Sequence, residues 1–148
     1  MPTLKNTIII DAAIEKIWHA LSQVDQLAVY DPSCERSVSI TKENAGIGAK
    51  RRVDMTDGKN WFEEKCTVYE EHQDLKYELT SCSFPVLNLN HQYSFRKLSD
   101  AKYEVTQVQN YKMKHGILGS IMAIMIKAKW NKGVRAFLGG LKQHAENH

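Results

Sequence analysis

The chain has 148 residues, of which 43% are hydrophobic and 25% are charged, and its formal net charge at pH 7 is +3. This composition is that of an ordinary globular protein, which excludes a disordered or fibrous chain and leads us to expect one domain over residues 1–148. The positive charge is weak and comes without a basic block, so we expect no nucleic-acid binding.

The first thirty residues predict a strand followed by two short helices. Residues 4–11 carry the β-branched run of a strand. Residues 13–22 predict a helix, because their large apolar residues recur on one helical stripe. That stripe consists of Ile14, Ile17, Trp18 and Leu21. A second short helix is expected around residues 25–30, before Pro32, since a proline disfavours helical backbone in the residue before it.

The middle of the chain predicts six further strands. They are expected at about 34–42, 48–56, 60–70, 75–82, 87–98 and 103–114. Asp57-Gly58 is a strong signal for a tight hairpin. Around this turn Val53 faces Phe62 and Arg51 faces Glu64, and the apolar side chains of both strands then share one face.

Two other turns bear on the register of the strands. A turn centred on Glu71-His72 sets Cys66 opposite Tyr77 and Val68 opposite Leu75. A two-residue loop at Asp100-Ala101 would break the alternation of the flanking strands, so we expect a longer loop or a bulge there. Strand 87–98 is expected to turn Leu87, Leu89, His91, Tyr93 and Phe95 inward.

The last thirty residues predict one long helix. Residues 116–126 (GILGSIMAIMI) are apolar nearly all the way round, which an ordinary surface helix is not. We expect Leu118, Met122 and Met125 to face a cavity. The stripe that continues the packing consists of Trp130, Val134, Phe137 and Leu141. The two stripes are offset, so either the helix bends near residues 129–133 or its first half contacts something other than its own sheet.

The predicted inward face of the sheet is unusually polar. It carries Arg51, Glu64, Tyr77, His91, Tyr93, Gln107, Gln109 and Tyr111. Leaving a buried polar group unpaired costs about 1–3 kcal/mol. So many polar groups indicate a partly hydrated cavity, because small-molecule sites combine apolar walls with a few converging polar groups. The alternative is a sheet face that water reaches from an open edge.

Two candidate groups on this face carry alternative interpretations. Arg51 is a candidate anchor for a carboxylate or phosphate head group with Glu64 holding it in place, or the two form a cross-strand ion pair. His91 is a candidate proton donor, or a histidine that is hydrogen-bonded to a neighbour. An acid–base role for Glu64 would need a raised pKa, and a nearby Arg acts in the opposite direction.

The sequence shows no recognisable pattern of metal ligands and no cofactor-binding motif. The histidines do not combine with carboxylates at ligand spacing, and Cys34, Cys66 and Cys82 fit no zinc pattern. We therefore expect no metal and no cofactor. The odd number of cysteines and the absence of a signal-peptide pattern lead us to expect reduced thiols and a cytoplasmic protein, without stable membrane insertion.

Four segments resemble the START-related, birch-pollen-allergen-like (SRPBCC) superfamily, in its polyketide cyclase/dehydrase and lipid-transport branch. They are residues 14–40, Gly46–Arg51, Glu64–Val68 and Gly133–Glu146. The resemblance implies an α+β helix-grip fold: a curved seven-stranded antiparallel sheet wrapped around a long C-terminal helix, with two short helices between strands 1 and 2. It also implies lipid, sterol or polyketide-like ligands. Tyr30 stands where the family often has Trp, and no shared catalytic set is carried over.

Three functions follow as hypotheses. The first is a carrier or sensor of a small hydrophobic or amphipathic molecule, bound between sheet and helix. The expected ligand-binding residues are Arg51, Glu64, Tyr77, His91, Tyr93, Gln109, Tyr111, Leu118, Met122 and Met125. The second is a polyketide cyclase or dehydratase with His91 or Glu64 as acid or base. The third is a dimerising or membrane-touching module that uses the apolar start of the last helix, and a homodimer is left open.

Overall fold

A computed structural model describes residues 2–114 and 120–148, with the side chains of residues 120–122 left undescribed. Ten elements follow one another along the chain. They are β1 (Thr3–Ile10), α1 (Ile14–Ser22), α2 (Leu27–Tyr30), β2 (Cys34–Ser39), β3 (Lys50–Met55), β4 (Trp61–Glu70), β5 (Asp74–Cys82), β6 (Val86–Ser99), β7 (Lys102–Met113) and α3 (Ser120–Asn147). The expected order of elements is confirmed.

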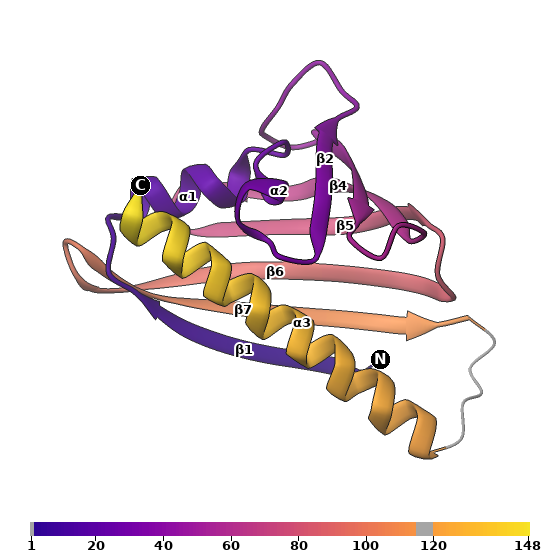
Figure 1. The fold of residues 1–148 in the computed structure, drawn as a ribbon. Coiled ribbons are helices and arrows are strands. Elements are labelled where there is room, and N and C mark those ends of the chain that lie inside the picture. The colour runs from indigo at the N-terminus through magenta and orange to yellow at the C-terminus, as the bar shows by residue number, and fades with distance from the viewer. Residues whose placement is uncertain (1, 115–119) are drawn as a thin grey trace.

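The seven strands form one antiparallel sheet in the order β1-β7-β6-β5-β4-β3-β2. The first strand of the chain therefore pairs with the last, and β1 and β2 are the two edges. Figure 1 shows α3 lying diagonally across one face of the sheet, with α1 and α2 beside its C-terminal end. The predicted helix-grip architecture is confirmed.

The hairpin at Asp57-Gly58 has the predicted register. Val53 pairs with Phe62 and Arg51 pairs with Glu64 across β3 and β4. Gly58 adopts a φ of 76°, a backbone conformation that glycine takes without steric cost. The hairpin fixes which side chains of β3 and β4 share the inner face, and this places the Arg51–Glu64 pair on the buried side of the sheet.

Bulges change the register at five places among the described residues, and three of them bear on the predictions. Cys66 pairs with Tyr77 as predicted, but a bulge then sets Leu75 opposite Tyr69, so the predicted pairing of Leu75 with Val68 is wrong. A bulge between Val86 and Asn88 leaves Leu87 53% exposed and buries Val86 instead. The bulge expected near Asp100 is confirmed between Lys97 and Ser99.

The core lies between the inner face of the sheet, α1, α2 and the C-terminal half of α3. The predicted stripe of α1 is buried throughout. From α3, Val134, Phe137 and Leu141 are buried as predicted. Gly140 permits a close approach of α3 to α2, because a Cβ there would overlap the backbone carbonyl oxygen of Tyr30.

The first half of α3 departs from the prediction. Met125 is 64% exposed and therefore does not face a cavity under the helix. The reason is geometric: at 100° per residue Met125 lies on the opposite side of the helix from the buried Val134. Leu118, and the side chain of Met122, lie outside the described part of the structure.

Candidate functional site

The site begins with a buried ion pair on neighbouring strands. Arg51 on β3 and Glu64 on β4 are 2% and 3% exposed, and Arg51 Nη2 lies 3.4 Å from Glu64 Oε1. The guanidinium also lies 4.4 Å from the ring centre of Tyr77 on β5, at cation–π distance. The cross-strand ion pair of the sequence-based interpretation is therefore present, and an aromatic face supports its cation.

His91 on β6 extends this pair across the sheet. Its Nε2 lies 2.6 Å from Glu64 Oε2, and its Nδ1 lies 2.9 Å from the hydroxyl oxygen of Tyr93. The imidazole stacks on the Tyr77 ring at a centroid distance of 5.4 Å, which bridges the intervening strand β5. Arg51, Glu64, His91 and Tyr93 thus form one continuous polar network.

The network continues to β7 through Gln107, whose Nε2 donates a hydrogen bond of 2.9 Å to the Tyr93 hydroxyl oxygen. An ionised Glu64 only accepts, so His91 Nε2 carries the proton of that contact. A neutral His91 then accepts at Nδ1 from the Tyr93 hydroxyl, which in turn accepts from Gln107. Every bond in the chain from Gln107 to Glu64 has a donor and an acceptor when His91 is neutral.

The electrostatics of the network keep Glu64 ionised. Burial raises the pKa of Glu64, but the charge of His91 when protonated, the charge of Arg51 and the hydrogen bonds from both outweigh it and hold the pKa at about 2. Burial raises the pKa of Tyr77 and of Tyr93 well above the usual value for a phenol. Glu64 is therefore a carboxylate at neutral pH, whereas both phenols keep their protons.

Three atoms of the network have no hydrogen-bond partner among the described residues. They are Arg51 Nε, Arg51 Nη1 and Gln107 Oε1. Each of these atoms is buried, and a buried polar atom without a partner costs about 1–3 kcal/mol. The inner face of the sheet therefore offers two cationic donors and one amide acceptor.

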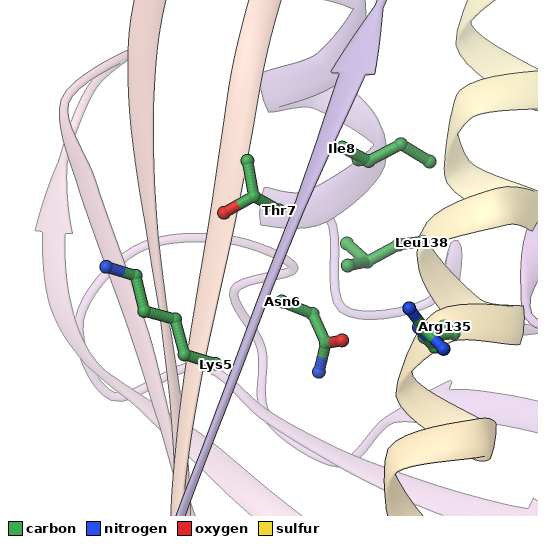
Figure 2. A pocket seen from close by; sticks show the side chains of 6 residues that line it. All are labelled: Lys5, Asn6, Thr7, Ile8, Arg135 and Leu138. Atoms are coloured by element: carbon green, nitrogen blue, oxygen red, sulfur yellow. The ribbon is translucent and has the colours of Figure 1, made fainter.

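A pocket of about 530 Å³ lies between β1 and α3 (Figure 2). Its lining residues are Lys5, Asn6, Thr7, Ile8, Arg135 and Leu138. Asn6 donates a hydrogen bond of 2.8 Å from Nδ2 to Asn131 Oδ1 on α3, and it pairs with Gln107 across β1 and β7. Gln107, at the end of the polar network, is therefore the backbone neighbour of Asn6, which lines this pocket.

The structure brings five of the ten predicted ligand-binding residues into contact. They are Arg51, Glu64, Tyr77, His91 and Tyr93. Gln109 pairs with His91 and is half-buried, whereas Tyr111 packs against Trp130 at 4.5 Å between ring centres. Their role in ligand binding stays a prediction, as does that of Leu118 and Met122, whereas the exposed Met125 does not line the pocket.

The sequence placed Gln107 on the inward face but did not mark it as a ligand-binding residue, and it missed Asn6. Asn6 alternates with the apolar Leu4 and Ile8 along β1, and this alternation was a usable signal. The described residues contain no group of three or more His, Cys, Asp or Glu that could hold a metal ion. The expectation that the protein binds no metal remains a prediction.

A family model described as polyketide cyclase / dehydrase and lipid transport matches residues 1–146. This chain belongs to that family. The description of this family covers cyclases and dehydrases as well as lipid-transport proteins. A search of curated proteins finds no match.

Solved structures of the same fold come from several bacteria. The chain superposes on the Zhui aromatase/cyclase from Streptomyces sp. R1128 with a TM-score of 0.83 at 14% identity, covering 98% of this chain and 93% of that one. It superposes on a START superfamily protein from Mycobacterium smegmatis with a TM-score of 0.80 at 12% identity, covering 97% of each chain. Identities this low support the fold of this family member and carry no role for a residue.

Within the described residues no helix combines the length and the apolar character needed to cross a bilayer.

Proposed function

We propose that this protein binds a small hydrophobic or amphipathic molecule between its sheet and α3, as a carrier or sensor. The observation that carries the proposal is the buried polar network with its unpartnered donors on Arg51 and its unpartnered acceptor on Gln107. A core that served stability alone would be expected to hold apolar side chains at these positions, because a buried polar atom without a partner destabilises the fold.

The pocket between β1 and α3 supports the same proposal. Its volume of about 530 Å³ falls within the range of about 300–1,000 Å³ that is typical of small-molecule sites. Ile8 and Leu138 supply apolar wall, while Lys5 and Arg135 supply positive charge. An amphipathic molecule with an acidic head group matches this combination of apolar walls and cationic side chains.

The test uses cis-parinaric acid, a fluorescent fatty acid, and its methyl ester. Ile8→Trp places a bulky ring in the pocket wall, so we expect the affinity for the acid to fall about tenfold or more, equivalent to about 1.4 kcal/mol. Ile9→Trp is the matched control, because Ile9 is the next residue along β1, is 45% exposed and is not among the residues that line the pocket.

Two results would refute the proposal: no saturable binding of the fatty acid, or equal binding by the Ile8→Trp and Ile9→Trp variants. The ester comparison tests the acidic head group separately. Weaker binding of the ester supports recognition by the cationic side chains, whereas equal binding contradicts it. Native mass spectrometry of freshly purified protein then gives the mass of any natural ligand.

A second function, an acid–base enzyme of the cyclase or dehydratase type, is favoured by one observation. Glu64, His91 and Tyr93 form a hydrogen-bonded chain of carboxylate, imidazole and phenol, the kinds of side chain that act in acid–base catalysis. Both ring nitrogens of His91 are occupied in this chain, so a substrate would have to displace one of its partners. Turnover of a poly-β-ketone substrate separates the two functions. An enzyme should turn the substrate over and lose this activity, but not parinaric acid binding, in His91→Ala, whereas a carrier should show binding without turnover in both proteins.

A further inference from the structure

The start of α3 exposes apolar side chains to solvent. Ile124 is 68% exposed and Met125 is 64% exposed. Leu87, in the bulge at the start of β6, is 53% exposed. The start of β6, the end of β7 and the start of α3 lie at the same end of the molecule (Figure 1).

Lysines accompany each of these apolar side chains. Lys127 follows Ile124 by three residues and Lys129 follows Met125 by four, which places each pair on neighbouring turns of one face of the helix. Ile124 and Lys127 line the same groove between β1 and α3. Beside Leu87, Asn88 pairs with Lys112 on β7. The basic–apolar end is defined here as Leu87, Lys112, Lys114, Ile124, Met125, Lys127 and Lys129.

Acidic residues are missing from the sequence that builds this end. Residues 105–145, which contain the end of β7 and nearly all of α3, include no Asp or Glu, and neither do residues 1–10 or 86–99. Lys112, Lys114, Lys127 and Lys129 form no ion pair with any residue that the structure describes. The positive charge of this end is therefore not neutralised within the described molecule.

We propose that the basic–apolar end docks on the surface of an anionic lipid bilayer. Exposed apolar side chains that enter the boundary of the acyl chains, flanked by lysines that meet lipid phosphates, are the elements by which surface helices bind membranes. Each lysine near an anionic bilayer adds to the electrostatic attraction. This docking is peripheral and requires no membrane-spanning helix.

Charge also decides against a protein partner, including a second copy of this chain. Lysine is depleted in protein–protein interfaces, and four of the seven residues in this patch are lysines. A second copy would bring the same lysines against these, because a two-fold interface joins the same patch of both subunits. An anionic lipid surface instead satisfies the lysines and the apolar side chains together.

The test measures co-flotation of the protein with vesicles of phosphatidylcholine alone or containing about 30% phosphatidylserine. We expect binding only to the anionic vesicles, and we expect it to weaken as NaCl rises from about 0.1 M to about 1 M, since the screening length falls from about 10 Å to about 3 Å. The variant Met125→Ser/Lys127→Glu should bind at least about tenfold more weakly. Both substituted residues are exposed, so we expect the variant to fold, and its thermal melting curve checks this.

The matched control is Ile47→Ser/Lys42→Glu in the loop between β2 and β3, away from α3 (Figure 1). It makes the same two changes of chemistry at exposed residues, so its vesicle binding should equal that of the unaltered protein. The proposal is overturned if the unaltered protein does not float with anionic vesicles, floats equally with neutral ones, or loses binding equally in both variants. A dimer that dissociates in the Met125→Ser/Lys127→Glu variant, without vesicle binding, also overturns it.

Membrane docking is independent of the proposed ligand. Parinaric acid binding by the vesicle-deficient variant should be unchanged, because neither Met125 nor Lys127 lines the pocket that holds Ile8. Loss of docking and loss of ligand binding are thus separate results.

Discussion

Along α3, the C-terminal half is packed into the core while the N-terminal half carries exposed apolar side chains. Ala123, Val134 and Leu141 lie within about 20° of one line along the helix at 100° per residue. Leu141 is fully buried, Val134 is 7% exposed and Ala123 is exposed. The difference teaches that an apolar stripe is buried only where a second layer lies beneath it. For α3 that layer consists of β1, α1 and α2, and it lies beneath the C-terminal end of the helix.

The largest effect is expected from breaking the polar network, whose Tyr93 packs against Phe137 in the packed half. Arg51→Met leaves Glu64 buried without its permanent counter-charge, and removing one partner of a buried ion pair costs about 3–5 kcal/mol. The double variant Arg51→Met/Glu64→Leu removes both charges and should recover most of this stability. Chemical denaturation of the three proteins measures it, and a double variant no more stable than Arg51→Met would contradict the ion pair.

The two halves of α3 can be compared directly by truncation. Phe137 contacts the rings of Tyr30 and Tyr93 at 5.5 and 6.0 Å between centres, so Phe137→Ala should destabilise the fold by about 3 kcal/mol. Met125→Ala, on the exposed half, should change stability by less than about 0.5 kcal/mol. Urea titration distinguishes the two, and a similar loss for both would mean that the N-terminal half is also packed.

Acidification probes the network without a mutation. The pKa of Glu64 is lowered from an ordinary 4.5 to about 2 in the folded protein, so its ionised form stabilises the fold above pH 4.5. This contribution is lost as the pH falls through about 2, and linkage sets it on the order of 3 kcal/mol. Thermal melting between neutral pH and pH 2 should show this loss in the unaltered protein and a smaller one in Glu64→Gln. Equal acid sensitivity of the two proteins would mean that a group other than Glu64 causes the loss of stability.

The smallest expected effect tests the contact between α3 and α2. Gly140→Ala adds a Cβ that meets the Tyr30 carbonyl, so overpacking should cost about 1–3 kcal/mol. Gly139→Ala, one residue earlier and with open space around the added Cβ, should stabilise the helix by up to about 1 kcal/mol. Melting temperatures that move in the same direction would show that this end of α3 is not held against α2.

The sequence alone predicted the fold and much of the inner face. Alternation along the strands and the Asp57-Gly58 turn were sufficient to pair Arg51 with Glu64, because a short hairpin loop leaves few registers open. Where a bulge interrupts the alternation, the prediction failed, as it did for Leu87 and for the pairing of Val68. A bulge adds one residue to one strand, and single-sequence alternation does not locate it reliably.

Local chemistry therefore determined the elements, their order and the polarity of one sheet face, since these depend on neighbours a few residues apart. Only the tertiary structure decided which polar groups touch. Glu64 and His91 meet across the intervening strand β5, and no spacing in the chain encodes their 2.6 Å contact. It also decided that Met125 is exposed while Phe137 is buried, because the placement of α3 over the sheet depends on how distant segments pack.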